Sequence, residues 1–141
     1  MHKATRRLQR AVTGLVLLCS TGLGSGFAAE GPMVLEPGQD GVQRTTIILD
    51  SYSYAPNHIV VQGGKPVELT LKSVTTFTPH NFVLKEPDAG MTVDQSVDHG
   101  DTAVVKFTPT RPGTYTFYCD KKLLFFASHR EKGMEGRLEV R

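Results

Sequence analysis

Short apolar runs separated by turn-forming residues follow one another along most of the chain. The clearest run is 67–72, where valine and leucine alternate with glutamate, threonine and lysine, so that an extended segment has one apolar and one polar side. Clusters of glycine, proline, asparagine and aspartate separate such runs. The pattern predicts strands over 45–49, 58–61, 67–72, 80–85, 103–107, 114–119 and 137–141. About seven to eight short strands at this spacing predict an all-β fold, a Greek-key β-sandwich.

The first 29 residues have the pattern of a secretory signal peptide. Four basic residues and no acidic residue precede an apolar run over 11–18, and small residues follow this run up to Ala28 and Ala29. The run is too short and too interrupted for a membrane span. We therefore expect a cleaved leader over 1–29 and a periplasmic or otherwise secreted mature protein with no membrane span. Retention of the leader as an anchor stays open.

The rest of the chain divides into two parts. Residues 30–43 hold several glycines and prolines and have no apolar period, which predicts a flexible lead-in. Residues 44–141 are enough to close one hydrophobic core, so we expect one domain there and a monomeric protein.

Loss of the leader changes the charge of the protein. The chain has 16 Lys and Arg and 14 Asp and Glu; without Lys3, Arg6, Arg7 and Arg10, 12 basic residues remain and the balance is −2. No basic patch is left to indicate a nucleic-acid partner. The sequence shows no catalytic triad, carboxylate pair or phosphate-binding glycine loop. We therefore expect neither nucleic-acid binding nor an enzyme.

A lone cysteine remains once the leader is removed. The chain has two cysteines, and Cys19 would leave with the leader, so Cys119 would be unpaired in an oxidising compartment. One explanation is a buried, inert thiol. The other is metal ligation.

The strand pattern brings Cys119 close to a histidine. Phe117 and Cys119 share a face of the strand 114–119, and His80 and Phe82 share a face of the strand 80–85. His80 begins its strand and Cys119 ends its own, so antiparallel strands would bring both to the same end of the sandwich.

Two further donors, His129 and Met134, lie between Cys119 and the last strand. Because this segment begins directly after Cys119, we expect both donors at the same end of the sandwich. Two imidazoles, a thiolate and a thioether suit a copper ion that cycles between Cu(I) and Cu(II). Zinc is the main competitor, but structural zinc sites usually use paired cysteines, which this chain lacks. The predicted metal ligands are His80, Cys119, His129 and Met134. Met91, expected in a loop after Gly90, is a substitute for Met134.

The stretches 79–81 (Pro-His-Asn), 113–119, His129 and 133–140, in this order and spacing, resemble the plastocyanin and azurin family of blue copper proteins, the cupredoxins. The resemblance runs over residues 45–141. It implies a cupredoxin-like sandwich with one copper ion, in which His80, Cys119 and His129 are ligands and Met134 is the axial ligand. It also implies that the Asn81 side chain ties the first ligand strand to the loop around the cysteine.

One departure from the family is large. Nine residues, 120–128, separate Cys119 from His129, whereas family members usually have only a few. This extended copper-ligand loop contains four consecutive apolar residues, 123–126, which would form a lid over the site, present a docking patch for a redox partner, or fill space against the sandwich. The longer loop also leaves a more open copper site as an alternative.

These observations lead to three hypotheses of function. The first is a one-electron carrier that exchanges electrons with redox partner proteins. The second is a periplasmic copper-binding carrier or resistance protein, which handles the metal rather than electrons. The third, a copper-free binding module, is the least consistent with four donors in order. The two other histidines of the domain, His58 and His99, are expected at the surface.

Overall fold

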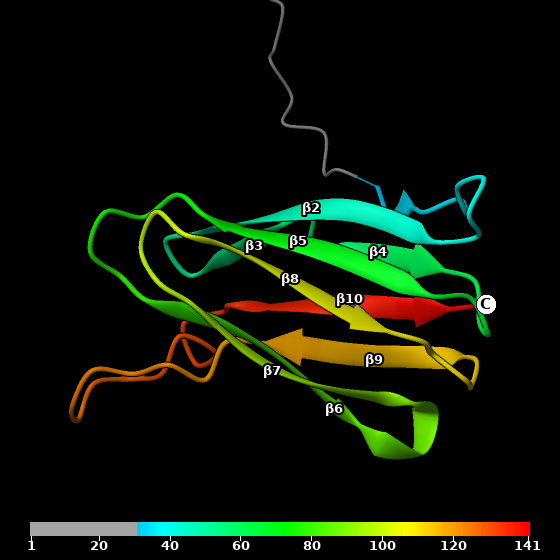
Figure 1. Ribbon diagram of the computed structural model, residues 1–141. Coiled ribbons are helices and arrows are strands. Elements are labelled where there is room, and N and C mark those ends of the chain that lie inside the picture. The colour runs from blue at the N-terminus through cyan, green and yellow to red at the C-terminus, as the bar shows by residue number, and fades with distance from the viewer. Residues whose placement is uncertain (1–30) are drawn as a thin grey trace, which may run out of the picture.

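The computed structural model of the protein describes residues 31–141, which form two β-sheets packed face to face (Figure 1). The larger sheet has the strand order β1, β4, β10, β9, β6, β7, and the smaller has the order β3, β2, β5, β8. The strands are β1 (Met33–Val34), β2 (Gln43–Asp50), β3 (Ser53–Ala55), β4 (His58–Val61), β5 (Val67–Ser73), β6 (His80–Glu86), β7 (Met91–Val97), β8 (Thr102–Phe107), β9 (Gly113–Tyr118) and β10 (Glu135–Val140), with a 3₁₀ turn, η1 (Pro87–Ala89), between β6 and β7. The predicted all-β sandwich is confirmed; the predicted signal peptide lies outside the described residues.

The core lies between the sheets and follows from side-chain alternation. In β5, Val67, Leu69 and Leu71 are buried and the residues between them are not. In the larger sheet, on the side that faces the core, Phe82 of β6 stacks on Phe117 of the neighbouring β9 with ring centroids 4.9 Å apart. These two rings fill the layer directly below the ends of β6 and β9 where the predicted ligands lie.

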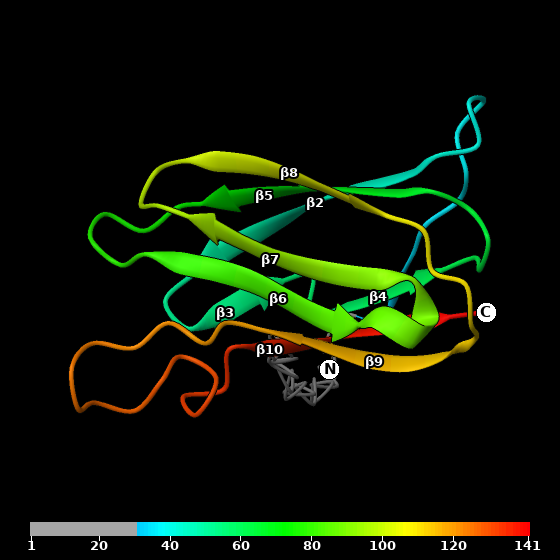
Figure 2. The ribbon, with the colours of Figure 1, turned by 60° about the horizontal axis from the view of Figure 1, so that its bottom comes forward.

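The arrangement of β6 and β9 decides where the predicted ligands meet. The two strands are antiparallel neighbours in the larger sheet, with Val83 opposite Tyr118. The start of β6 and the end of β9 therefore lie at the same end of the sandwich. Two views of the molecule show the long loop between β9 and β10 projecting from this end (Figures 1 and 2). This end is called the loop end below.

Three strands were not expected from the sequence. The most important is β7, which pairs with β6 along its whole length, so Met91 lies in a strand and not in a loop. The three-residue β3 pairs with the end of β2. The two-residue β1 pairs with β4, and Leu35 after it is buried, so this part of the expected flexible lead-in is packed on the sandwich.

Within residues 31–141, no helix has the length and apolar character needed to cross a membrane.

Candidate metal centre

All four predicted ligands lie at the loop end. His80 is the first residue of β6, Cys119 directly follows β9, and His129 and Met134 lie in the loop before β10. His80, Cys119 and Met134 are fully buried, and His129 is 6% exposed. Residues from three separate parts of the chain thus meet in one buried place.

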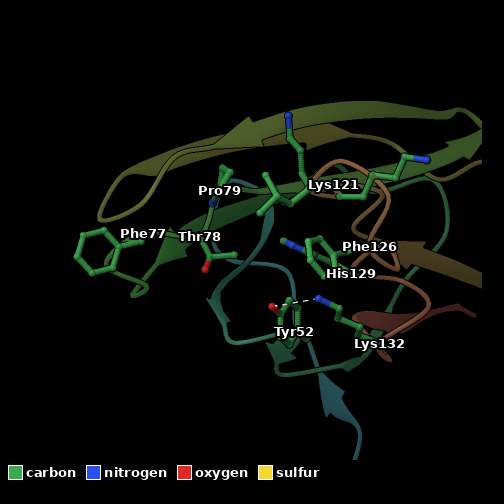
Figure 3. Close-up of a pocket in the computed structure, with 10 residues that line it drawn as sticks. Tyr52, Phe77, Thr78, Pro79, Lys121, Phe126, His129 and Lys132 are labelled. Carbon is green, nitrogen blue, oxygen red and sulfur yellow. Dashed lines mark hydrogen bonds between the residues drawn. The ribbon is translucent and has the colours of Figure 1, made fainter.

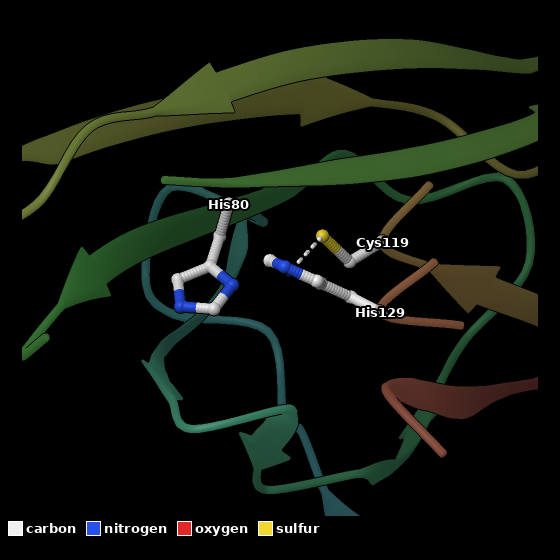
Figure 4. Close-up of side chains that lie close together, drawn as sticks. All are labelled: His80, Cys119 and His129. Atoms are coloured by element: carbon white, nitrogen blue, oxygen red, sulfur yellow. Dashed lines mark hydrogen bonds between the residues drawn. The ribbon is translucent and has the colours of Figure 1, made fainter. Parts of the chain in front are cut away.

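Three of the four residues offer donor atoms that lie close to one another. One ligand atom each from His80, Cys119 and His129 lies within 4.8 Å of the other two. Cys119 Sγ is 3.3 Å from His129 Nδ1, and the two imidazole centroids are 5.1 Å apart (Figure 4). The convergence of two nitrogens and one sulfur that the strand pattern predicted is therefore present in the structure.

Backbone hydrogen bonds hold the two ends of the loop together at the site. The Cys119 N–H donates to the carbonyl of Met134 at 3.1 Å, and the Met134 N–H donates to the carbonyl of His129 at 2.9 Å. The His129 N–H donates to the carbonyl of Lys121 at 2.8 Å. Cys119, His129 and Met134 are thus fixed relative to one another, although the first two are ten positions apart in the sequence.

The His80 imidazole has no hydrogen-bond partner in the part of the chain that the structure describes. Both of its ring nitrogens are buried and unpaired. Buried polar atoms are normally satisfied, and an unsatisfied one costs free energy. Burial, with a smaller contribution from the neighbouring His129, lowers the pKa of His80 to about 4. At neutral pH the ring is therefore uncharged, which is the form that binds a metal ion.

The environment of Cys119 is that of a protonated thiol in the metal-free protein. Burial raises the pKa of Cys119, although the Asn81 N–H donates to its sulfur at 3.4 Å and opposes this shift. A metal ion that binds the thiolate would have to displace the proton. Burial likewise lowers the pKa of His129, so both imidazoles favour the neutral form.

The Asn81 side chain forms the tie that was expected. Its Nδ2 donates to Asp120 Oδ1 at 2.8 Å, and its Oδ1 accepts from the Asp120 N–H at 3.1 Å. Nδ2 also donates to Asp94 Oδ1 at 3.2 Å. β6 is thereby joined to the residue after Cys119 and to β7.

Tyr54 supports the same place and was missed in the sequence. Its hydroxyl donates to the carbonyl of Asn81 at 2.6 Å, and its ring packs edge-on against Phe117 at 5.2 Å. Burial raises the pKa of Tyr54 well above its usual value, so it remains a donor. Nothing in the turn-rich stretch around Tyr54 indicated this contact.

The other candidates lie away from the donors. Met91 pairs with Glu86 at the far end of β6 from His80, so it is no substitute for Met134. His58 is partly buried and contacts Glu139 at 3.3 Å, and His99 lies exposed in the turn after β7.

A cavity of about 350 Å³ leads from solvent to His129 (Figure 3). Its walls come from the β2–β3 turn, the β5–β6 connection and the long loop, and include Tyr52, Phe77, Lys121 and Phe126. His129 is the only one of the four predicted ligands among its lining residues. It is therefore the predicted ligand through which the buried site comes closest to the surface.

The four apolar residues of the loop do not pack on the sandwich, although Leu123 and Phe126 line the cavity that leads to His129. Leu123, Leu124, Phe125 and Phe126 are all exposed. Of the three roles weighed from the sequence, filling space against the sandwich does not agree with this exposure. A docking surface agrees with it.

The donor set fits copper better than other biological metals. Neutral imidazoles suit Cu(II), whereas thiolate and thioether ligands favour Cu(I). His80 offers two buried nitrogens that have no partner within residues 31–141, one of which a metal ion would satisfy. A two-sheet β-sandwich with a His-Cys-His set at one end defines the class of small copper proteins.

The chain belongs to the cupredoxin-like domain family, whose family model matches residues 15–134. The resemblance noted in the sequence is therefore confirmed. Copper is the cofactor of this family, and one ion per domain agrees with the single cluster of His80, Cys119 and His129 found among residues 31–141.

Solved structures with the same fold come from different kinds of protein. The metal-binding domain of the Streptococcus pneumoniae D39 Cu(I)-exporting P-type ATPase CopA, with Cu(I), is 22% identical, with a TM-score of 0.59, over 79% of this chain and 96% of that one. Reduced auracyanin from Roseiflexus castenholzii is also 22% identical, with a TM-score of 0.56, over 70% of this chain and 96% of that one. A multicopper oxidase from Campylobacter jejuni, 13% identical with a TM-score of 0.59, matches 79% of this chain but only 29% of its own.

Proposed function

We propose that the protein is a one-electron carrier whose single copper ion is held by His80, Cys119 and His129, with Met134 as a weaker axial ligand. The observation that carries this proposal is the approach of three donor atoms to within 4.8 Å of one another in a buried site. Copper bound there supplies a one-electron couple between Cu(I) and Cu(II).

The surrounding residues suit a site that changes little between two oxidation states. β6 and β9 fix His80 and Cys119, and the Asn81–Asp120 hydrogen bonds restrain the loop. A site held in one geometry needs little rearrangement for each electron. Four protein donors also leave no open position for a substrate, which supports a carrier rather than an enzyme.

His129 is the route we propose for the electron. It is the predicted ligand that lines the cavity, so a redox partner protein would approach the copper most closely there. We further propose that residues 1–29 direct the protein to the periplasm or outside the cell, and that it acts as a monomer.

Copper handling is the second candidate function. It is favoured by the cavity of about 350 Å³ at His129, which gives an incoming chelating group access to one ligand. The fold is also that of a metal-binding domain solved with Cu(I). In this alternative the protein receives Cu(I) and passes it on.

Repeated redox cycling in the presence of a Cu(I) chelator tests the proposal. The purified chain, loaded with one equivalent of Cu(II), is reduced and reoxidised several times, and protein-bound copper is measured after each cycle. An electron carrier retains its copper and recovers its oxidised spectrum. Loss of the copper to the chelator at the first reduction would instead support copper handling.

A further inference from the structure

Residues 123–126 form an exposed apolar turn at the outermost part of the loop end. The Phe126 N–H donates to the carbonyl of Leu123 at 3.0 Å, which closes a β-turn with Leu124 and Phe125 at its two central positions. These two side chains are 73% and 87% exposed, and neither lines the cavity. Four bulky apolar side chains in succession are thus presented to solvent.

The sequence of this turn is not explained by turn formation. Leu124 has a φ of 49°, in the left-handed region where glycine and asparagine are preferred. A leucine at this position costs the free protein free energy in two ways: its backbone adopts a left-handed conformation, and its apolar side chain is exposed to water. The apolar side chains therefore indicate a surface that buries them.

The shape of the loop favours a bilayer over a groove-forming protein as that surface. Both ribbon views show the loop extending away from the sandwich, as a projection and not as a flat face (Figures 1 and 2). Phe77 of the β5–β6 connection is also 87% exposed and lines the same cavity as Leu123 and Phe126. A projecting apolar tip matches insertion into the boundary between lipid headgroups and acyl chains.

Positive charge lies directly beside the apolar tip. Lys121 and Lys122 precede the turn, and neither forms an ion pair within residues 31–141. Lys132 follows it and donates to the Tyr52 hydroxyl at 3.2 Å. If the apolar tip is inserted in a membrane, lysines directly beside it would contact the headgroups of anionic lipids.

The acidic residues of the loop keep their charge but form no ion pair with Lys121 or Lys122 within residues 31–141. In the loop itself, the Asp120 carboxylate accepts from Asn81 and the Glu131 carboxylate accepts from Ser128, while Glu135 at the start of β10 pairs with Arg130. The turn between β7 and β8, which holds Asp98 and Asp101, lies apart from the long loop in both ribbon views.

We propose that residues 121–126 form a membrane-docking loop, in which Leu124 and Phe125 insert into an anionic lipid surface and Lys121 and Lys122 contact its headgroups. Docking by this loop would hold the His129 end of the protein against the membrane. This inference does not depend on the proposed electron transfer, because it uses no property of the metal.

A single tryptophan tests the proposal, because the chain has none. In Phe125→Trp, the emission of the new side chain reports the surroundings of the tip itself, independently of any contact that residues 1–30 make with the vesicles. The full chain, without added copper, is mixed with vesicles of phosphatidylglycerol and phosphatidylcholine or of phosphatidylcholine alone. We expect a blue-shifted emission with the anionic vesicles and quenching by brominated acyl chains. The matched control is Val104→Trp, at a site on β8 that is 51% exposed, where neither change is expected.

Charge variants test the role of the lysines in the same assay. Lys121→Gln with Lys122→Gln in the Phe125→Trp chain should weaken partitioning to anionic vesicles by about 30-fold. Lys65→Gln, at the opposite end of the sandwich, should leave partitioning unchanged. Emission of Phe125→Trp that is the same with and without anionic vesicles would overturn the proposal and leave a protein as the partner of the loop. Equal partitioning to neutral vesicles would overturn the role of the lysines.

Discussion

Each predicted ligand reaches the site for a different local reason. His80 is placed by the start of β6, and Cys119 by the end of β9. His129 and Met134 are placed by the backbone hydrogen bonds that close the base of the loop. Because the buried His80 nitrogens have no partner among residues 31–141, the metal-free site is the less favourable state of these side chains.

Met134 should set the reduction potential if it is the axial ligand. An amide oxygen stabilises Cu(II), whereas an apolar side chain offers no donor, so Met134→Gln should have a lower potential than Met134→Leu. Potentiometric titration of the copper-loaded proteins measures this difference. Met91→Leu is the matched control, since Met91 is equally buried but lies at the far end of β6, and its potential should equal that of the unmodified chain. Identical potentials in both Met134 variants would exclude an axial role.

Asn81 should matter for stability and for copper affinity. Asn81→Ala removes three side-chain hydrogen bonds, including the reciprocal pair with Asp120, and leaves partners unsatisfied. We expect the free energy of unfolding to fall by about 2 kcal/mol, and copper affinity to fall by about tenfold. Denaturant unfolding and competition with a chelator measure the two effects.

The control for this variant is Gln95→Ala, since among residues 31–141 the Gln95 side chain bonds only the carbonyl of the adjacent Ser96. It should change stability by less than about 0.5 kcal/mol. If Asn81→Ala is no more destabilising than Gln95→Ala, the tie between β6 and the loop has no energetic role.

At the scale of elements, the close packing of β9 and β10 supports the strand that directly precedes Cys119. Gly136 of β10 lies opposite Phe117 of β9. A Cβ at position 136 would overlap the Phe117 ring and lie 2.7 Å from the carbonyl oxygen of Asn57. Only glycine therefore fits without a shift of the core aromatic rings.

Gly136→Ala should consequently destabilise the fold. We expect a loss of about 2 kcal/mol in the free energy of unfolding, because overpacking against backbone cannot relax easily. Gly31→Ala, where a Cβ meets no atom within 4 Å, should be close to neutral. A Gly136→Ala protein as stable as Gly31→Ala would contradict the packing described here.

The strands that carry the site could be predicted from two signals. Apolar residues recur at every second position, and the strand that becomes β6 begins with His80, a candidate ligand. β7 was missed although Met91, Val93 and Val97 are buried at period two, since Asp94 and Gln95 interrupt the apolar pattern. β1 and β3 are two and three residues long and exist through pairing with distant strands. No local pattern encodes such pairing.

The same limit applies to the site. The order of histidine, cysteine, histidine and methionine could be found in the sequence, and so could Asn81. The contact of Tyr54 with the Asn81 carbonyl could not, because the two residues are 27 positions apart and only the fold brings them together. Whether the apolar residues 123–126 are buried also depends on the space around the loop, which the sequence does not describe.

At the scale of the whole molecule, one end of the sandwich combines the buried donors, the cavity at His129 and the exposed loop. The opposite end carries the C-terminus and the β4–β5 turn (Figure 1). This asymmetry means that a partner or a membrane that binds the loop end also lies nearest to the copper site. Electron transfer and docking would therefore share one end of the protein.

The visible absorption spectrum after addition of Cu(II) tests the central claim most directly. We predict an intense thiolate-to-copper band that saturates at one copper per chain, is lost in Cys119→Ser and is retained in Cys19→Ser. Replacing the chain's other cysteine makes Cys19→Ser the matched control. A Cys119→Ser protein with unchanged spectrum and copper affinity would contradict the account.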